Sequence, residues 1–209
     1  MKVTEITELT KSRVKIYIDD AFAFVLYKGE LRINHIKDGQ EVDEADYQNI
    51  MEVLLPKRAK LRCMNLLKTK SYTRWQLTDK LKQGGYPEQV IEKALAYVTS
   101  YGYVNDEQYA KDYIEYHKTT RSRTRIMNDL YKKGILKETA ENAWEETVGS
   151  EQKDIEQEQI LKLLQKKHYD GKNATYEEKQ KIMAFLFRRG FTMDAIRNAL
   201  LLDITSIYV

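Results

Sequence analysis

Positively charged residues gather in one stretch of this sequence. Between residues 57 and 82, nine lysines and arginines stand against a single acidic residue, Asp79. The nine are Lys57, Arg58, Lys60, Arg62, Lys68, Lys70, Arg74, Lys80 and Lys82. Such a cluster can neutralise phosphate groups with release of counterions, which gives salt-sensitive nucleic-acid binding with little sequence preference. It can equally meet an acidic protein surface, and ordinary solvated helix faces account for part of it.

Further basic groups follow at places that correspond to one another. They are Lys118, Arg121, Arg123 and Arg125 at an expected junction of two helices, and Arg188 with Arg189 at an expected turn. The net charge of the chain is only +3, yet residues 1 to 50 hold 7 basic and 10 acidic side chains, and residues 51 to 104 hold 10 basic and 4 acidic. This asymmetry favours an anionic partner. Tyr72 and Trp75 lie among the cations and can stack on bases, but rings at helical spacing, such as Tyr97, Tyr101, Tyr109 and Tyr113, are expected in the core.

Residue patterns for catalysis are missing from the sequence. His35, His117 and His168 are isolated from one another, and the single cysteine, Cys63, leaves no pair for a zinc site or an internal disulfide. No phosphate-binding glycine motif occurs. We therefore expect no catalytic residue, no metal and no cofactor. An enzyme with an unrecognised site stays open only if a closed pocket with shifted carboxylate titration exists.

Membrane and export signals are also missing. The longest apolar run is the seven residues from Ala21 to Tyr27, whereas a membrane-spanning helix needs about 20. The first nine residues are too polar for a secretory signal, and Cys63 in the apolar LRCMNLL segment is typical of a small core residue. We expect a cytoplasmic, monomeric protein with no membrane partner.

The first 55 residues predict a small β element and a connecting helix. Val14, Ile16 and Ile18 alternate with polar residues, Asp19-Asp20 can form a two-residue turn, and Phe22, Phe24 and Leu26 are expected to continue on the same face of a hairpin. Residues 2 to 9 can add a third strand. A helix is expected from about Asp43, which Pro56 either interrupts or follows by starting the next helix.

Three copies of one signature occupy the remainder of the chain, each with leucine four residues before a glycine and a large apolar residue directly after it. The copies are Leu81, Gly85 and Tyr86, then Leu130, Gly134 and Ile135, then Leu186, Gly190 and Phe191. The spacings of 49 and 56 residues between the glycines leave room for three helices per copy. Apolar residues also agree at matching offsets, with Leu77, Ile126 and Ile182 eight residues before the glycine, and Ala94, Ala143 and Ala199 nine after it.

These signatures predict structural roles rather than a binding site. The glycine permits the left-handed conformation that ends the second helix of each copy. Capping boxes at Thr73 with Gln76 and at Thr175 with Glu178 start those helices, and Ser122 can cap the equivalent one. The fold class is therefore mainly all-α. Three tandem three-helix repeats, at 56 to 104, 105 to 150 and 151 to 209, are expected to form an elongated curved array after a β-hairpin or three-strand element at 1 to 55.

A second set of residues joins the first and second copies. Gly102, Tyr103, Val104, Asn105 and Asp106 are followed by Tyr109 and Ala110, and the third copy closes with Arg189, Gly190 and Phe191. Together with the basic first repeat, these residues resemble the signatures of the RecX family. The resemblance covers about residues 57 to 203, and the N-terminal strands lie outside it.

The resemblance implies a regulator of the RecA recombinase with no active site. A member of this family is expected to bind in the groove of the RecA–DNA filament and to modulate ATP hydrolysis, strand exchange and coprotease activity in recombinational repair and the SOS response. Its partners would be the RecA filament and, weakly and salt-dependently, single- or double-stranded DNA. The alternative is a stand-alone helical-repeat protein that binds DNA without sequence preference through the same cations.

Overall fold

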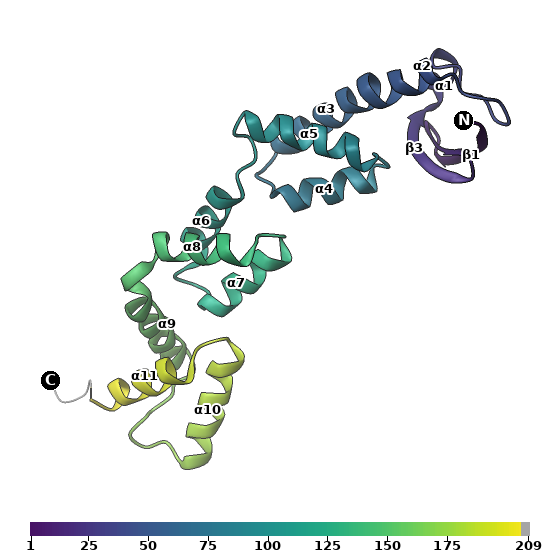
Figure 1. Ribbon diagram of the computed structural model, residues 1–209. Helices are drawn as coiled ribbons and strands as arrows, with labels where there is room; N and C mark the ends of the chain where they lie inside the picture. The colour runs from purple at the N-terminus through teal and green to yellow at the C-terminus, as the bar shows by residue number, and fades with distance from the viewer. Residues whose placement is uncertain (206–209) are drawn as a thin grey trace. The chain divides into compact units, whose positions relative to one another are not determined.

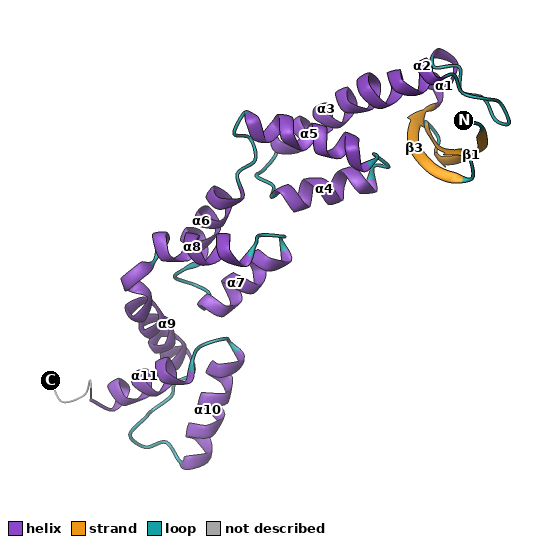
Figure 2. Cartoon of the chain, viewed as in Figure 1, coloured by secondary structure: helices purple, strands orange, loops and turns teal. Residues whose placement is uncertain are grey.

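The computed structural model describes residues 1–205, which divide into two compact units (Figure 1). Unit 1 runs from Met1 to Asn105, and unit 2 begins at Asp106. Unit 1 contains the strands and the first group of three helices, and unit 2 contains the other two groups (Figure 2). The mainly helical class with a small N-terminal sheet is confirmed.

The N-terminal sheet has three antiparallel strands in the order β1-β2-β3: β1 (Val3–Thr10), β2 (Arg13–Ile18) and β3 (Ala21–Tyr27). Asp19 and Asp20 have φ angles of 47° and 63°, the positive values that a tight two-residue hairpin turn requires. The predicted hairpin and third strand are thus confirmed. Phe22 was expected on the buried face but is 47% exposed, because the register shifts between Ile16 and Tyr17 and places Phe22 opposite Tyr17.

A helical connection leads from the sheet into the first repeat. It comprises α1 (Lys28–Ile33), α2 (Glu44–Asn49) and the π-helical turn η1 (Ile50–Leu54), and it continues directly into α3 (Leu55–Leu67), the first helix of the first repeat. Pro56 lies in the first turn of α3, as one of the two sequence interpretations has it. Proline has no N–H to donate to the carbonyl four residues back. The π-helical turn η1 directly precedes Pro56, and in it the Leu55 N–H donates to the Ile50 carbonyl five residues back.

The other helices form the expected groups of three. In unit 1, α3 is followed by α4 (Arg74–Gln83) and α5 (Glu88–Ser100). Unit 2 has α6 (Asp106–His117), α7 (Arg123–Lys132) and α8 (Lys137–Thr147), then the short η2 (Gly149–Glu151), α9 (Gln152–Lys166), α10 (Tyr176–Arg188) and α11 (Met193–Thr205). The exact repeat boundaries stay a prediction, and the last four residues of the expected third repeat lie outside the described part.

The signature glycines end α4, α7 and α10 as expected. Gly85, Gly134 and Gly190 have φ angles of 77°, 81° and 90°. At each turn, the N–H of the residue after the glycine donates to the carbonyl of the signature leucine, at 3.3, 3.1 and 3.4 Å in chain order. The N–H of each glycine donates to the carbonyl three residues before it. These paired bonds form a Schellman motif, which satisfies carbonyls that the end of a helix leaves free.

Each repeat contributes its matching apolar residues to a core. The residues eight before, four before and nine after the signature glycine are buried in all three copies, and Cys63 is buried in unit 1. The capping boxes at Thr73 and Thr175 are present as predicted. Tyr109 and Tyr113 pack against the core of the second repeat. The expectation of a core position is wrong for Tyr97 and Tyr101, whose exposures are 37% and 61%, because they lie on the solvent side of the end of α5.

Candidate cationic interface

The second and third repeats meet at the start of α7. Ser122 stands at the N-cap position of α7, but its hydroxyl makes no capping bond, contrary to the sequence interpretation. It donates instead to the Arg189 carbonyl at 2.6 Å. A Cβ on the next residue, Gly190, would lie 2.8 Å from the Ser122 Oγ. The turn between α10 and α11 therefore sits directly against the N-terminus of α7.

Two hollows flank this contact and share Arg125 and Arg189. The smaller, of about 260 Å³, is lined by Thr119, Thr120, Arg121, Ser122, Arg125, Gln159, Lys162, Leu163, Lys166, Arg189 and Phe191. The larger, of about 530 Å³, is lined by Thr124, Arg125, Asn128, Asp129, Lys132, Arg188, Arg189 and Gly190. We call the two hollows and their lining residues the cationic junction. Thr119, Thr124 and Asn128 are exposed beside its cations and carry hydroxyl or amide groups of the kind that contact phosphates.

Several cations of the cationic junction keep their charge available to a ligand. Arg125, Lys132, Lys166 and Arg188 are exposed, and none of them forms an ion pair within residues 1–205. Arg189 is also exposed and lies 5.0 Å from the centre of the Phe185 ring. An exposed cation with no carboxylate partner loses little when it binds a phosphate or an acidic side chain.

The neighbouring basic residues named from the sequence have internal partners. Arg121 pairs with Asp129 at 2.8 Å and donates to the Tyr113 hydroxyl at 2.9 Å. Arg123 pairs with Glu141 and lies 5.6 Å from the Trp144 ring centre. Lys118 pairs with Glu115, and the backbone carbonyls of Lys118 and Arg121 accept from the Gln159 amide at 2.5 and 3.1 Å. These contacts brace the loop that carries the cationic junction.

His117 reports the electrostatic environment of this loop. The pKa of the His117 ring lies below its usual value, first because of partial burial and then because of the positive charge of Arg121. Lys133 and Arg125 lower this pKa further, and Asp129 opposes them. Positive potential near the loop thus disfavours an added proton, and the same potential attracts an anion.

The nine cations between residues 57 and 82 of unit 1 divide in a similar way. Arg58 bridges the first repeat to the N-terminal region, because its guanidinium pairs with Glu30 at 2.9 Å and lies 4.5 Å from the Tyr27 ring centre. Arg74 pairs with Glu92, and Lys82 with Glu88. The other six, Lys57, Lys60, Arg62, Lys68, Lys70 and Lys80, form no ion pair within the described residues. Lys60 and Lys70 lie against the rings of Tyr97 and Tyr72.

Sequence reasoning missed three lysines of the cationic junction. Lys132 directly precedes Lys133 and Gly134, just as Arg188 precedes Arg189 and Gly190, so the repeat alignment itself contained this signal. Lys162 and Lys166 are four residues apart on α9 and thus share one helical face. Nothing in their local sequence indicates that this face lies beside α7.

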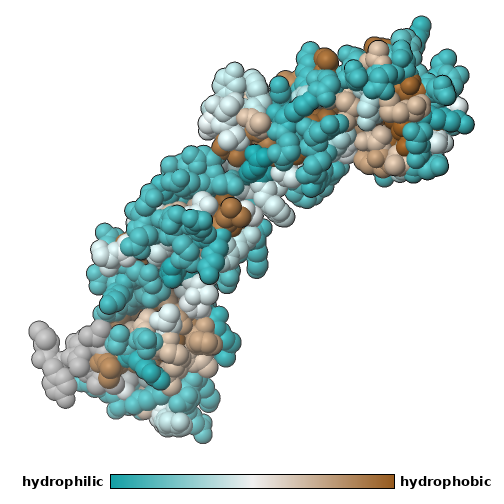
Figure 3. All heavy atoms as spheres, viewed as in Figure 1, coloured by the Kyte–Doolittle hydropathy of each residue, from teal (hydrophilic) through white to brown (hydrophobic). Residues whose placement is uncertain are grey.

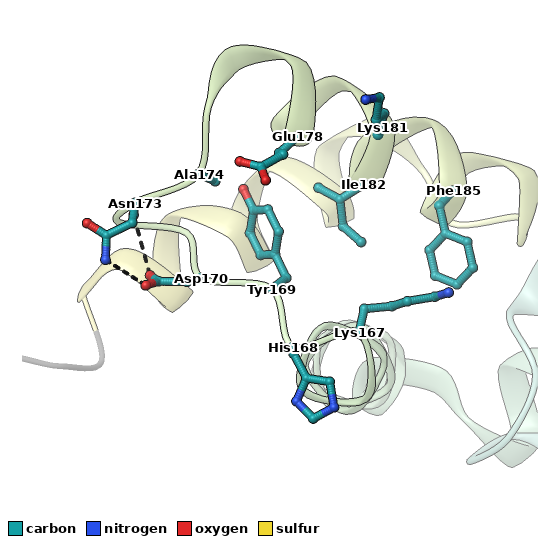
Figure 4. Close-up of a pocket in the computed structure, with 10 residues that line it drawn as sticks. All are labelled: Lys167, His168, Tyr169, Asp170, Asn173, Ala174, Glu178, Lys181, Ile182 and Phe185. Carbon is teal, nitrogen blue, oxygen red and sulfur yellow. Dashed lines mark hydrogen bonds between the residues drawn. The ribbon is translucent and has the colours of Figure 1, made fainter.

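A third hollow, of about 450 Å³, lies within the third repeat between the end of α9 and α10 (Figure 4). Its carboxylates already serve the local structure. Hydrogen bonds from Asn173 and from the Lys172 backbone hold the pKa of Asp170 below its usual range, and the backbone and side chain of Thr175 lower the pKa of Glu178. A general acid or base working near neutral pH needs a raised carboxyl pKa. The geometry therefore gives no support to acid–base chemistry in this hollow.

The described residues contain neither a metal-binding cluster nor a membrane-spanning helix. Among residues 1–205, no group of three or more histidine, cysteine, aspartate or glutamate side chains is placed to hold a metal ion. Within the same range, no helix is both long enough and apolar enough to cross a membrane.

The three-helix groups define the protein as a tandem helical-repeat protein. Two family models match it: "RecX, first three-helix domain" over residues 59–97 and "RecX, third three-helix domain" over residues 154–200. The chain belongs to the RecX family.

Known relatives agree with this assignment along nearly the whole chain. Regulatory protein RecX of Caldanaerobacter subterraneus subsp. tengcongensis is 34% identical over 202 residues, which cover 96% of this chain and 98% of that protein. Regulatory protein RecX of Clostridioides difficile is 30% identical over 192 residues, with coverage of 90% and 88%.

Solved structures share the fold. A crystal structure of regulatory protein RecX matches with a TM-score of 0.61 at 23% identity, covering 94% of this chain and 97% of that one. RecX from Lactobacillus salivarius matches with a TM-score of 0.63 at 23% identity, covering 72% and 97%.

Proposed function

We propose that this protein regulates the RecA recombinase by binding in the groove of the RecA–DNA filament. Bound there, it modulates ATP hydrolysis, strand exchange and coprotease activity during recombinational repair and the SOS response. It acts in the cytoplasm as a monomer, by binding and not by catalysis. The relatives are named regulatory proteins, and the cationic junction is the observation that supports the proposal most directly.

The chemistry of the cationic junction suits a nucleoprotein polymer. Arg125, Lys132, Lys166 and Arg188 present charge that no internal carboxylate neutralises within the described residues. A DNA–protein filament offers both phosphates and acidic side chains to such cations. Repeats that each bind weakly gain affinity when several engage one polymer at once. The elongated curved array of repeats stays a prediction, and it would let several repeats contact one filament at the same time.

The first experiment measures RecA ATPase activity on single-stranded DNA with stoichiometric amounts of the protein. We expect a clear change in the ATPase rate with the wild-type chain. The variant Arg125→Glu/Arg188→Glu is expected to lose most of that effect. The matched control Lys137→Glu/Lys153→Glu makes the same change in net charge at exposed lysines outside the two hollows and is expected to behave like the wild type.

Two results would count against the proposal. An unchanged ATPase rate with stoichiometric wild-type protein would reject regulation of the filament. Equal loss of effect in the cationic-junction variant and the control would mean that net charge matters and that the cationic junction does not.

The second candidate function is DNA binding without RecA. The same cations support it, and it predicts an affinity that falls steeply as salt rises. Contact with about four phosphates of single-stranded DNA gives a slope of roughly −3 for log K against log salt. A flat salt response of the free protein on oligonucleotides would reject this function.

A further inference from the structure

A groove of about 610 Å³ opens along α3 in unit 1. It is lined by Glu52, Val53, Pro56, Lys57, Lys60, Leu61, Met64, Asn65, Lys68 and Tyr97. Eight of these residues belong to the continuous helical stretch of η1 and α3, Lys68 is the C-cap residue of α3, and Tyr97 comes from α5. We call this the α3 groove, and its residues differ entirely from those of the cationic junction.

The floor of the α3 groove is apolar and open to solvent. Val53 and Leu61 are 59% and 55% exposed, and Met64 is partly exposed beside them. Brown, apolar surface is visible over the α3 region in Figure 3 amid mostly hydrophilic spheres. Branched aliphatic side chains gathered in a hollow of this size are typical of a site that another molecule covers.

The Tyr97 ring forms one wall of the α3 groove, and the rings of Tyr101 and Tyr103 extend this wall. Tyr97 stands in the groove, its ring centre is 4.8 Å from that of Tyr101, and the Tyr101 ring centre is 6.0 Å from that of Tyr103. All three rings are exposed. Tyrosine provides a large apolar area at a low cost in side-chain entropy, and it is enriched at the centres of protein interfaces.

The edges of the α3 groove are positively charged. Lys57 and Lys68 are exposed and form no ion pair within residues 1–205. The Lys60 ammonium lies 4.6 Å from the Tyr97 ring centre, and Lys60 likewise forms no ion pair within the same residues. Glu52, the one acidic residue of the lining, pairs with Lys93. The groove therefore presents an apolar floor between uncompensated positive charges.

We propose that the α3 groove binds an acidic amphipathic helix of a partner protein. Val53, Lys57, Leu61 and Lys68 follow one another at steps of four or seven residues along one face of the helix. Apolar residues at the i and i+4 or i+7 positions of a bound helix match the aliphatic floor, and carboxylates on its flanks match the lysines. A nucleic acid strand matches less well, because the aliphatic floor of Val53 and Leu61 can neither stack on its bases nor form hydrogen bonds with them, which leaves only the tyrosine wall and the lysines to contact it.

This inference is independent of the proposed function. It concerns unit 1, it needs no nucleic acid, and variants of the cationic junction leave it untouched. The α3 groove could therefore be shown to bind such a helix even if the effect on RecA ATPase were absent, and the reverse also holds.

The experiment uses the full chain and a fluorescein-labelled model helix. The probe is a capped 16-residue peptide with leucines at i, i+3 and i+4 spacing and glutamates elsewhere, and binding is followed by fluorescence anisotropy. We expect saturable binding that Leu61→Glu weakens at least about tenfold, since one charge would be placed in the floor. Lys57→Glu/Lys68→Glu is expected to weaken binding as well.

Leu136→Glu is the matched control. Leu136 is 73% exposed and lies in unit 2, at the N-cap of α8, so the same substitution there changes charge without touching the groove. Binding by this variant is expected to equal that of the wild type. Because both leucines are exposed, both variants are expected to fold, and their circular dichroism spectra check this.

Four outcomes would overturn the inference. The first is that the acidic peptide fails to bind saturably, and the second is that Leu61→Glu and Leu136→Glu bind it equally. The third is that a peptide with lysine in place of every glutamate binds as tightly as the acidic one. The fourth is that a labelled oligo(dT) strand binds in preference to the peptide and that Leu61→Glu abolishes this binding, which would make the α3 groove a nucleic-acid surface.

Discussion

Substituting alanine for Gly85 tests how the N-terminal sheet is held against the first repeat. Gly85 ends α4 with a φ of 77°, and a Cβ at this position would lie 2.2 Å from the Val25 Cγ2 and 3.0 Å from the Val25 Cβ. Val25 belongs to β3 and is buried. The strand therefore approaches the turn more closely than any side chain on residue 85 allows.

The expected loss of stability has two parts. An alanine in the left-handed conformation costs about 1 to 2 kcal/mol. Relief of the overlap with Val25 requires the strand or the turn to shift, and forced overpacking costs about 1 to 3 kcal/mol more. Gly85→Ala should thus lower the free energy of unfolding of unit 1 by about 2 to 5 kcal/mol.

Gly102→Ala separates the two parts. Gly102 has a φ of 70°, nearly the same as Gly85, but apart from its own chain neighbours no heavy atom of the described residues lies within 4 Å of the position that its Cβ would take. This control should lose only the conformational cost of about 1 to 2 kcal/mol. The difference between the two variants then measures the close approach of Val25 alone.

Urea unfolding followed by circular dichroism provides the measurement. Equal slopes in urea for the two variants would show that the comparison concerns stability and not a change in the unfolded state. A double-mutant cycle with Val25→Ala adds a second check, because removing the Cγ2 atom should recover part of the loss. The reasoning is refuted if Gly85→Ala and Gly102→Ala unfold at the same urea concentration.

Three other predictions concern single side chains. Burial raises the pKa of the Cys63 thiol from its ordinary value of 9.0 to about 11, so the thiolate fraction at pH 8 falls about a hundredfold. Iodoacetamide should therefore modify the native chain at least about a hundredfold more slowly than the urea-unfolded chain. Equal rates for the two would contradict this. Burial also raises the pKa of Glu156 in the folded state. The charged carboxylate is therefore disfavoured in the folded protein, and stability is lost as pH rises through that raised pKa. Glu156→Gln should raise the midpoint temperature of thermal unfolding at pH 7 and change it less at acidic pH. Arg58→Ala should cost about 2 to 3 kcal/mol in urea unfolding, because it leaves the largely buried Glu30 carboxylate with the Tyr27 N–H but without its ion-pair partner. Arg62 is an exposed neighbour without an ion pair in the described part, so Arg62→Ala should change stability by no more than about 0.5 kcal/mol.

Much of the fold could be read from local patterns. The signature leucines and glycines predicted where α4, α7 and α10 end, because a left-handed turn needs glycine and the preceding leucine faces the core at helical spacing. The Asp19-Asp20 hairpin was equally local. Phe22 was misplaced because the register shift beside Tyr17 arises from the pairing of two strands, and a single strand's alternation contains no sign of it.

The candidate binding surfaces were only partly predictable. The sequence showed that cations concentrate in the first repeat and recur later, and it named Arg125, Arg188 and Arg189. It gave no means of separating them from Arg58 or Arg123, whose charges are engaged by Glu30 and Glu141. Those ion pairs join residues that are 28 and 18 positions apart in the chain, and only folding brings them together.

The sequence by itself determined the helical repeats, the small N-terminal sheet and the excess of positive charge, because these depend on residue types and on spacings within a few turns of helix. The tertiary structure decided which cations remain available, that Ser122 bonds to the turn before α11, and that Val53 and Leu61 lie in an open groove. Each of these depends on which surfaces of separate elements meet, and contacts between distant segments follow from the packing of the whole unit and not from the pattern of any one segment.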